Sequence, residues 1–169
     1  LIEKSGETVC ADPKRRWIID PISGTTNFAH GIPHFAISIA LEEHGKLIAA
    51  LVYNPISDDL FLAEKGQGAT RNNHRLRVSL RRHLSDCVLA TGVPDEGSIQ
   101  PEKYAAQMEL VRNSLEGVRH FGSAALDLAF VAAGRVDAFW HINLSICDVA
   151  AGNLLIREAG GFITDMEGK

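Results

Sequence analysis

Long apolar runs, paired cysteines and an excess of basic residues are all missing from this sequence, and each absence excludes a class of protein. No apolar run reaches the roughly 18 residues that a membrane-spanning helix needs, and no signal peptide is visible. The three cysteines, Cys10, Cys87 and Cys147, are odd in number and widely spaced, so they form neither a zinc motif nor a disulfide framework. A reducing, cytoplasmic setting is therefore expected.

Basic residues do not dominate the charge balance either. The formal net charge is -4, whereas a nucleic-acid groove or a protein bound to an anionic membrane calls for a basic face. We therefore expect neither nucleic acid nor membrane as the main partner. The one basic stretch, RLRVSLRRH at 75–83, alternates like a strand whose charged side faces water.

The sequence does contain enough apolar residues for a sizeable core, since 46% of its 169 residues are hydrophobic and 22% are charged. Strand signals dominate the first half, where short apolar runs alternate with turns rich in Gly, Pro, Asn and Asp. These runs are WIID at 17–20, HFAISIAL at 34–41, KLIAALVY at 46–53, LFLAE at 60–64 and LRVSL at 76–80. They predict an antiparallel meander. The apolar side chains of Trp17, Phe28, Phe35, Ile39 and Trp140 are expected to pack in the core.

The second half predicts alternating strands and helices, which are typical of an α/β layered domain. The expected strands are 87–92, 136–144 and 162–166, and the expected helices are 101–117, a buried one capped by Ser123, and 148–161 capped by Asp148. We therefore divide the chain into an antiparallel half, 1–83, and an α/β half, 84–169. Both ends look cut, because the chain opens on Leu1 and stops in what resembles a hairpin.

Three carboxylates stand at the ends of expected elements, where folding can bring them together. Asp20 ends a strand, Asp148 opens a helix and Glu3 lies in a polar stretch before a loop. Converging carboxylates repel one another unless a cation lies between them, and hard oxygen ligands suit Mg²⁺. Taken singly, each has a commoner role as a turn residue, a helix cap or a solvated surface acid.

The turn after Asp20 adds further oxygen atoms, because the Ile22 carbonyl and the Thr25 hydroxyl can also meet a cation. Gly24 lets the backbone approach a ligand closely. Asp127, in the middle of an apolar helix, is expected to be held by donors nearby.

Two long motifs resemble those of a known family. WIIDPISGTTNFAHGIPHFAISIAL and DVAAGNLLIREAGG resemble the signatures WxxDPxDGTxNF and WDxxAGxxxxxEAGG of the inositol monophosphatase family. GQGATRN, ATGVP and GSAALDLAFVAAGRVDAFW also resemble family segments in order and spacing. The resemblance implies an αβαβα layered fold, here without the N-terminal helices and the last strand and helix. It also implies a homodimer that hydrolyses small phosphate monoesters with two or three Mg²⁺ ions.

The resemblance also implies roles for particular residues. Glu3, Asp20 and the Ile22 carbonyl would bind a first metal, with Thr25 and Glu3 orienting the attacking water. Asp20 and Asp148 would bind a second metal, for which position 23 normally supplies another ligand. The positions implied to face the substrate are Ser23, Gly24, Thr25, Ala124, His141 and Asp148.

Four residues depart from the family pattern, and they cluster at this site. Ser23 replaces an aspartate of the signature, Lys4 a glutamate, His141 a glutamate of inositol-specific members and Cys147 the signature tryptophan. We expect Ser23 at least to weaken the second metal. Inositol monophosphate or a similar polyol or sugar phosphate is the expected substrate, with histidinol phosphate or a nucleotide 3′-phosphate as alternatives. A catalytically silent binding or dimerisation module is the rival interpretation.

Overall fold

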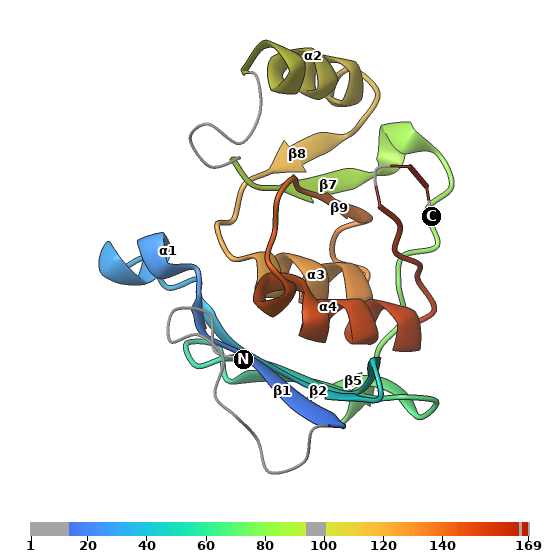
Figure 1. The fold of residues 1–169 in the computed structure, drawn as a ribbon. Coiled ribbons are helices and arrows are strands. Elements are labelled where there is room, and N and C mark those ends of the chain that lie inside the picture. Colours follow the sequence, from blue (N-terminus) through green and yellow to red (C-terminus); the bar gives the residue numbers. More distant parts are fainter. Residues whose placement is uncertain (1–13, 94–100, 166, 169) are drawn as a thin grey trace.

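The computed structural model describes residues 14–93, 101–165 and 167–168, which form two sheets separated by a pair of helices (Figure 1). The larger sheet is antiparallel, and its strand order follows the chain. Its strands are β1 (Arg15–Ser23), β2 (Ala36–Glu43), β3 (Lys46–Asn54), β4 (Asp59–Glu64), β5 (Gly68–Arg71) and β6 (His74–Arg75). The predicted meander is therefore confirmed.

The strand predicted at 76–80 is wrong. This segment leaves the sheet after β6 and crosses toward the second half, where the Val78 N–H donates to the Ala159 carbonyl at 3.2 Å. Leu76 is buried in the core on the way. The alternating apolar residues of 76–80 thus belong to a segment that crosses between the two halves and that pairs with no described strand.

Two of the aromatic side chains expected in the core lie at the surface instead. Trp17, on β1, is 52% exposed, and Phe28, on α1 (Thr25–Ala29), is 51% exposed. The Phe28 ring meets Phe35 edge to face, with 5.0 Å between the ring centroids. An aromatic residue beside a strand therefore did not mark a buried position here.

The smaller sheet is parallel, with β7 (Val88–Thr91) between β8 (Gly117–Arg119) and β9 (Ala138–Trp140). The predicted helix 101–117 ends earlier, because α2 spans Pro101–Arg112 and Gly117 pairs with Val88 in the sheet. The strand predicted over 136–144 is only β9. Residues 162–165 form no strand.

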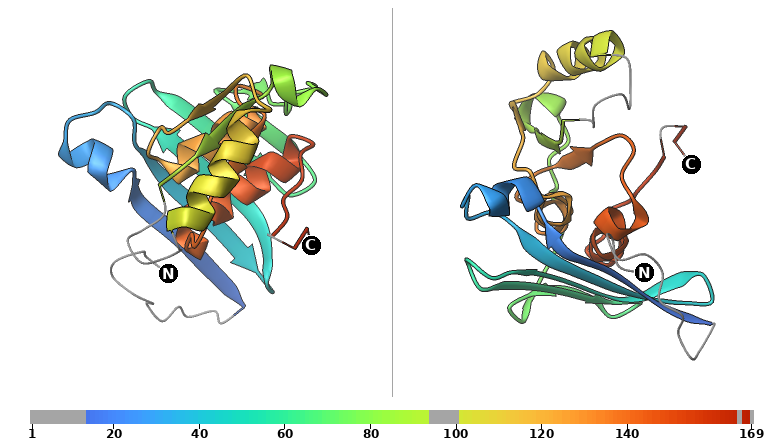
Figure 2. Two further views of the ribbon diagram at one scale, coloured as in Figure 1. Left: turned by 90° about the horizontal axis from the view of Figure 1, so that it is seen from above. Right: turned by 60° about the vertical axis from the view of Figure 1, so that its left-hand side comes forward.

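The remaining helices are α3 (Ala124–Ala132), α4 (Ile146–Glu158) and the 3₁₀ turn η1 (Leu84–Asp86). Figures 1 and 2 show the layers in order: the six-stranded sheet, then α3 and α4, then the three-stranded sheet, then α2. This is the expected α/β layering of an antiparallel meander followed by an α/β half, and the described strands of the second sheet are parallel. Among the described residues, no helix covers the outer face of the six-stranded sheet. None of the helices within these ranges is long and apolar enough to cross a membrane.

Helix α4 lies across the six-stranded sheet and joins both halves of the chain in one core. It approaches α3 closely at Gly152, where a Cβ atom would overlap the Leu128 side chain. At its C-terminal end, the Glu158 carboxylate accepts hydrogen bonds from the Gly66 and Gly68 amides, both at 2.8 Å. Helix α4 therefore also fixes the β4–β5 turn.

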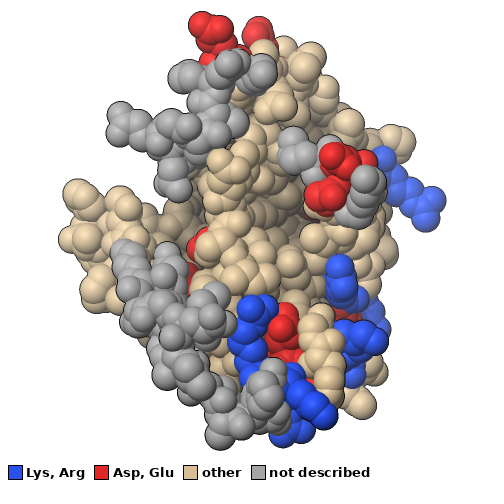
Figure 3. Space-filling model, viewed as in Figure 1, with Lys and Arg blue, Asp and Glu red and all other residues tan. Residues whose placement is uncertain are grey.

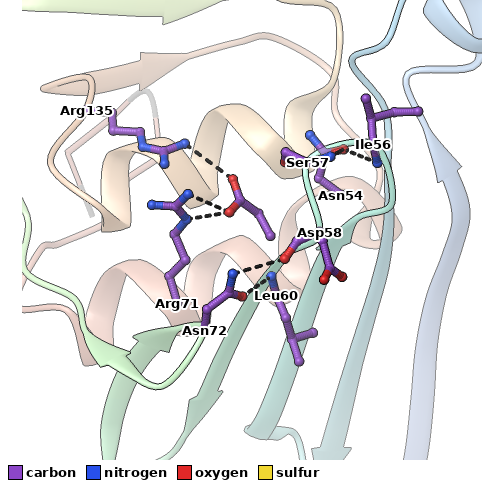
Figure 4. Close-up of polar contacts among 9 residues, drawn as sticks. Asn54, Ile56, Ser57, Asp58, Leu60, Arg71, Asn72 and Arg135 are labelled. Carbon is purple, nitrogen blue, oxygen red and sulfur yellow. Dashed lines mark hydrogen bonds and ion pairs between the residues drawn. The ribbon is translucent and has the colours of Figure 1, made fainter.

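A buried carboxylate ties the far end of the sheet to the helical layer (Figure 4). Asp59 pairs with Arg71 at 2.6 Å and with Arg135, which follows α3, at 3.8 Å. Beside it, the Asn72 side chain accepts from the Leu60 amide and donates to the Asp58 carbonyl. Because the charge of Asp59 is paired, this acid is structural.

Candidate active site

The segment after Asp20 continues the strand through an irregularity and then turns sharply. The β1–β2 register shifts between Asp20 and Ser23. Asp20 is buried, and its Oδ1 accepts a hydrogen bond from the Ile22 amide at 3.1 Å. Gly24 has φ 95°, and a Cβ there would lie only 3.0 Å from the Gly122 carbonyl oxygen. Glycine is thus required both by the left-handed turn and by the close approach of the loop before α3.

Asn27 explains why the motif carries an asparagine after its two threonines. Its side-chain amide donates to the His34 and Phe121 carbonyls, both at 2.7 Å. These bonds hold α1 against the loop that leads into α3. The role of Asn27 is structural, and nothing in the spacing of the motif pointed to it.

Ser23 is buried, at 4% exposure, and its hydroxyl is engaged by the start of α3. The Ser23 Oγ accepts a hydrogen bond from the Ser123 hydroxyl at 3.0 Å and another from the Ala125 amide at 3.2 Å. A hydroxyl oxygen has two lone pairs, and both are used here. Ser23 therefore has no lone pair left for a cation unless one of these bonds is given up.

The N-terminus of α3 is capped as predicted, because the Ser123 Oγ accepts from the Leu126 amide. That of α4 differs from the prediction. Ser145 is the cap, and Asp148 lies three residues later in a capping box, with its Oδ2 accepting from the Ser145 amide at 2.7 Å. Cys147, beside it, is buried in the core. Asp148 is therefore held by one carboxylate oxygen at the start of α4.

These elements enclose a cavity of about 230 Å³. It is lined by Asp20, Ile22, Ser23, Gly24, Thr25, Thr26, Gly92, Val93, Gly122, Ser123, Ala124, Asp127, Phe139, His141 and Asp148. Each described residue that was predicted to bind metal or substrate is in this lining, whereas Cys147, which was also placed at the site, is not. Glu3 and Lys4 lie outside the described residues. The sequence interpretation missed Asp127 and Phe139 as lining residues, since both read as parts of buried elements.

Asp127 is the unexpected member of this lining. It is 2% exposed, and its Oδ1 is buried without a hydrogen-bond partner among the described residues, contrary to the expectation that donors nearby would hold it. Burial raises the pKa of Asp127 to about 7. The carboxyl group is thus poorly satisfied in its charged form.

The imidazole ring of His141 also lines the cavity. Its Nδ1 lies 2.8 Å from the Ile142 carbonyl oxygen, which can only accept, so Nδ1 carries the proton. In the neutral ring, Nε2 is then a hydrogen-bond acceptor. The ring stacks on Phe139 at 6.1 Å and lies over Gly92, where a side chain would overlap it.

The lining has a one-sided charge: three aspartates and, within the described part of the chain, no lysine or arginine. On the face drawn in Figure 3, the basic side chains gather mainly at the lower right, beside acidic ones. A phosphate dianion would be repelled by this cavity unless a cation entered with it.

The donor set fits such a cation. Asp20, Asp148, the unpartnered Oδ1 of Asp127 and the Ile22 carbonyl all offer oxygen, which Mg²⁺ prefers. Over the described ranges, however, no three His, Cys, Asp or Glu side chains already stand close enough together to hold a metal.

Comparison with known proteins assigns the chain to a family. The sequence model of the inositol monophosphatase family matches residues 2–169 of this chain. The chain is 53% identical over 168 residues to the inositol-1-monophosphatase of Rhizobium meliloti and 47% identical over 168 residues to the Nus factor SuhB of Escherichia coli, covering 99% of this chain and 63% of each relative. It thus spans less than two thirds of the length of these curated relatives.

Solved structures agree with the sequence comparison. The extragenic suppressor protein suhB of Bartonella henselae superposes with a TM-score of 0.96 at 55% identity, covering 99% of this chain and 64% of that one. The inositol monophosphatase of Anabaena gives a TM-score of 0.89 at 39% identity, covering 99% and 69%. The chain belongs to the inositol monophosphatase family, a family of metal-dependent phosphomonoesterases.

Proposed function

We propose that this cavity hydrolyses a small phosphate monoester, most plainly inositol monophosphate or a similar polyol or sugar phosphate, with Mg²⁺ as cofactor. The observation that carries the proposal is the charge of the lining: Asp20, Asp127 and Asp148 with no basic side chain among the described lining residues. A site of this kind attracts a divalent cation first and an anionic substrate only with it. The names of the relatives from Rhizobium and Anabaena support the same reaction.

The residues proposed to hold the metal are Asp20, Asp148 and the Ile22 carbonyl, with Glu3 from outside the described residues. Bound Mg²⁺ would supply an activated water and neutralise charge on the reacting oxygens. Asp20 is kept in place by the Ile22 amide and Asp148 by the Ser145 amide, so each carboxylate has a fixed direction.

The remaining residues bind and orient the substrate in this proposal. Thr25, exposed at the start of α1, would direct the attacking water with Glu3. Gly24 and Ala124 bring backbone close to the phosphate, although the Ala125 and Leu126 amides are already used by Ser23 and Ser123. The Nε2 atom of neutral His141 would accept a hydrogen bond from a substrate hydroxyl, which favours a polyol.

The experiment that tests this proposal is phosphate release from inositol monophosphate by the purified protein, with Mg²⁺ and with EDTA. Histidinol phosphate, a nucleotide 3′-phosphate and a sugar phosphate should be compared in parallel. We expect metal-dependent release that is greatest with a polyol phosphate. Release that persists in EDTA, or none from any of these substrates at saturating Mg²⁺, would overturn the proposal. Light scattering on the same sample tests the accompanying expectation of a homodimer.

A second candidate function is supported by Ser23. Because the Ser123 hydroxyl and the Ala125 amide already donate to its oxygen, the second metal position would lack a ligand and catalysis would be impaired. The chain would then act as a binding or dimerisation module. That a relative of 47% identity carries the name Nus factor SuhB shows that enzymatic names are not universal among its relatives. Metal binding without turnover would favour this alternative.

A further inference from the structure

Asp127 is a buried acid for which the described part of the protein provides no partner on one of its oxygens. An unsatisfied buried polar atom destabilises the folded protein, and more so when it is charged. Such a cost is relieved by a proton, by a hydrogen-bond donor or by a cation. Since Asp127 lines the cavity together with Asp20 and Asp148, a group that enters the cavity can supply this relief.

The hydroxyl group that precedes Asp127 by one helical turn is already committed. Ser123 lies four residues before Asp127, on the same face of α3, but its hydroxyl donates to Ser23 and its oxygen accepts from Leu126. The described lining contains no lysine or arginine. The hydroxyl groups of Ser23 and Ser123 thus bond to each other and to the start of α3. Next to them, Asp127 Oδ1 is a buried acceptor without a partner among the described residues.

We propose that the Asp127 carboxylate helps to hold the divalent cation in this cavity and supplies the negative charge that Ser23 does not. The inference rests on the proposed function, because it concerns the same cation. Asp127 stands one helical turn beyond the Ser23–Ser123 hydrogen bond, so it belongs to the wall on which the missing carboxylate would have stood. Mg²⁺ usually keeps several of its waters, so Asp127 contacts the ion directly or through one of them.

The test is the affinity of the protein for Mn²⁺, read from the loss of the free-ion electron paramagnetic resonance signal. Three variants are compared with the parent: Asp127→Asn, the double variant Ser23→Asp/Asp127→Asn, and Asp59→Asn. The last removes a buried carboxylate that Arg71 and Arg135 already pair and that does not line the cavity. Circular dichroism confirms that each variant is folded.

We expect Asp127→Asn to weaken Mn²⁺ binding at least tenfold, the double variant to regain most of the loss, and Asp59→Asn to bind like the parent. Unchanged affinity in folded Asp127→Asn would overturn the inference while leaving the proposed function intact. If the parent itself bound no Mn²⁺, the proposed function would fail first. Equal weakening by Asp59→Asn would show a general effect of removing buried charge and would also overturn the inference.

Discussion

At the scale of single residues, Ser23 is the departure whose consequence the structure defines most sharply. An aspartate there would meet the Ser123 hydroxyl and the Ala125 amide at the N-terminus of α3, where negative charge is stabilised. We therefore expect Ser23→Asp to fold normally and to raise Mg²⁺ affinity by at least tenfold, equivalent to about 1.4 kcal/mol. Isothermal titration measures this change. Ser23→Asn, of similar size but neutral, is the control, and an equal gain in it would contradict the role of charge.

Asp127 predicts a dependence of stability on pH in metal-free buffer. Its pKa in the folded protein, about 7, lies above the ordinary value of 3.8, so folding favours the protonated form. The stability associated with this proton is complete below about pH 4 and is lost as the pH rises through 7. We expect Asp127→Asn to equal the parent near pH 4 and to exceed it near pH 8, by up to about 4 kcal/mol. Urea unfolding in EDTA at the two pH values measures the difference, and a constant offset would refute it.

Sequence reasoning identified residues that line one cavity where the type of residue carries the signal. Asp20, Ser23, Thr25 and Asp148 stand in long motifs, and all four line one cavity. It failed for Asp127, because an acid in an apolar helix looks the same in sequence whether donors surround it or a cavity adjoins it. The pairing of Ser23 with Ser123, 100 residues apart, was equally beyond local pattern.

At the scale of helices and strands, the first half was predictable because period-2 alternation and turn residues agreed. The shorter pieces were not. Strand β8 has three residues and is defined by pairing with β7, and α1 has five and is held by Asn27. Such elements owe their conformation to tertiary contacts, which no local periodicity records. The same reason explains why residues 162–165 did not form the strand that their apolar character predicted.

The contact between α3 and α4 makes a prediction for a glycine inside a helix. Alanine normally stabilises a helix by about 1 kcal/mol relative to glycine, but at position 152 its methyl group would overlap Leu128. We expect Gly152→Ala to lower the free energy of unfolding by about 1–3 kcal/mol. Chemical denaturation of the single variant and of Gly152→Ala/Leu128→Ala measures it. Strictly additive effects in this pair would show that the two residues do not interact.

At the scale of the whole molecule, the outer face of the six-stranded sheet is apolar where an exposed antiparallel sheet usually carries polar side chains. Cross-strand pairing places Ile19, Ile39, Leu51 and Leu62 in one row across four strands. The half-exposed Trp17 lies beside this row. No described helix covers this face (Figure 2).

This uncovered face should bind a hydrophobic dye. We expect the 169-residue chain to enhance the fluorescence of anilinonaphthalene sulfonate. We expect Leu62→Lys to reduce that enhancement by about half or more, because a charge in the row disfavours apolar ligands. Leu80→Lys is the matched control, since Leu80 is 90% exposed and lies away from the sheet. Equal fluorescence in the two variants would mean that the dye binds elsewhere.

Helix α4 has a use that its packing alone does not suggest. One end positions Asp148 at the cavity, and the other grips the Gly66 and Gly68 amides through Glu158, so a rigid rod about 20 Å long connects the two places. Because both ends of α4 are held by hydrogen bonds, a tilt of the helix at one end also moves the other end. An insertion in the distant β4–β5 hairpin would therefore displace Asp148 at the cavity.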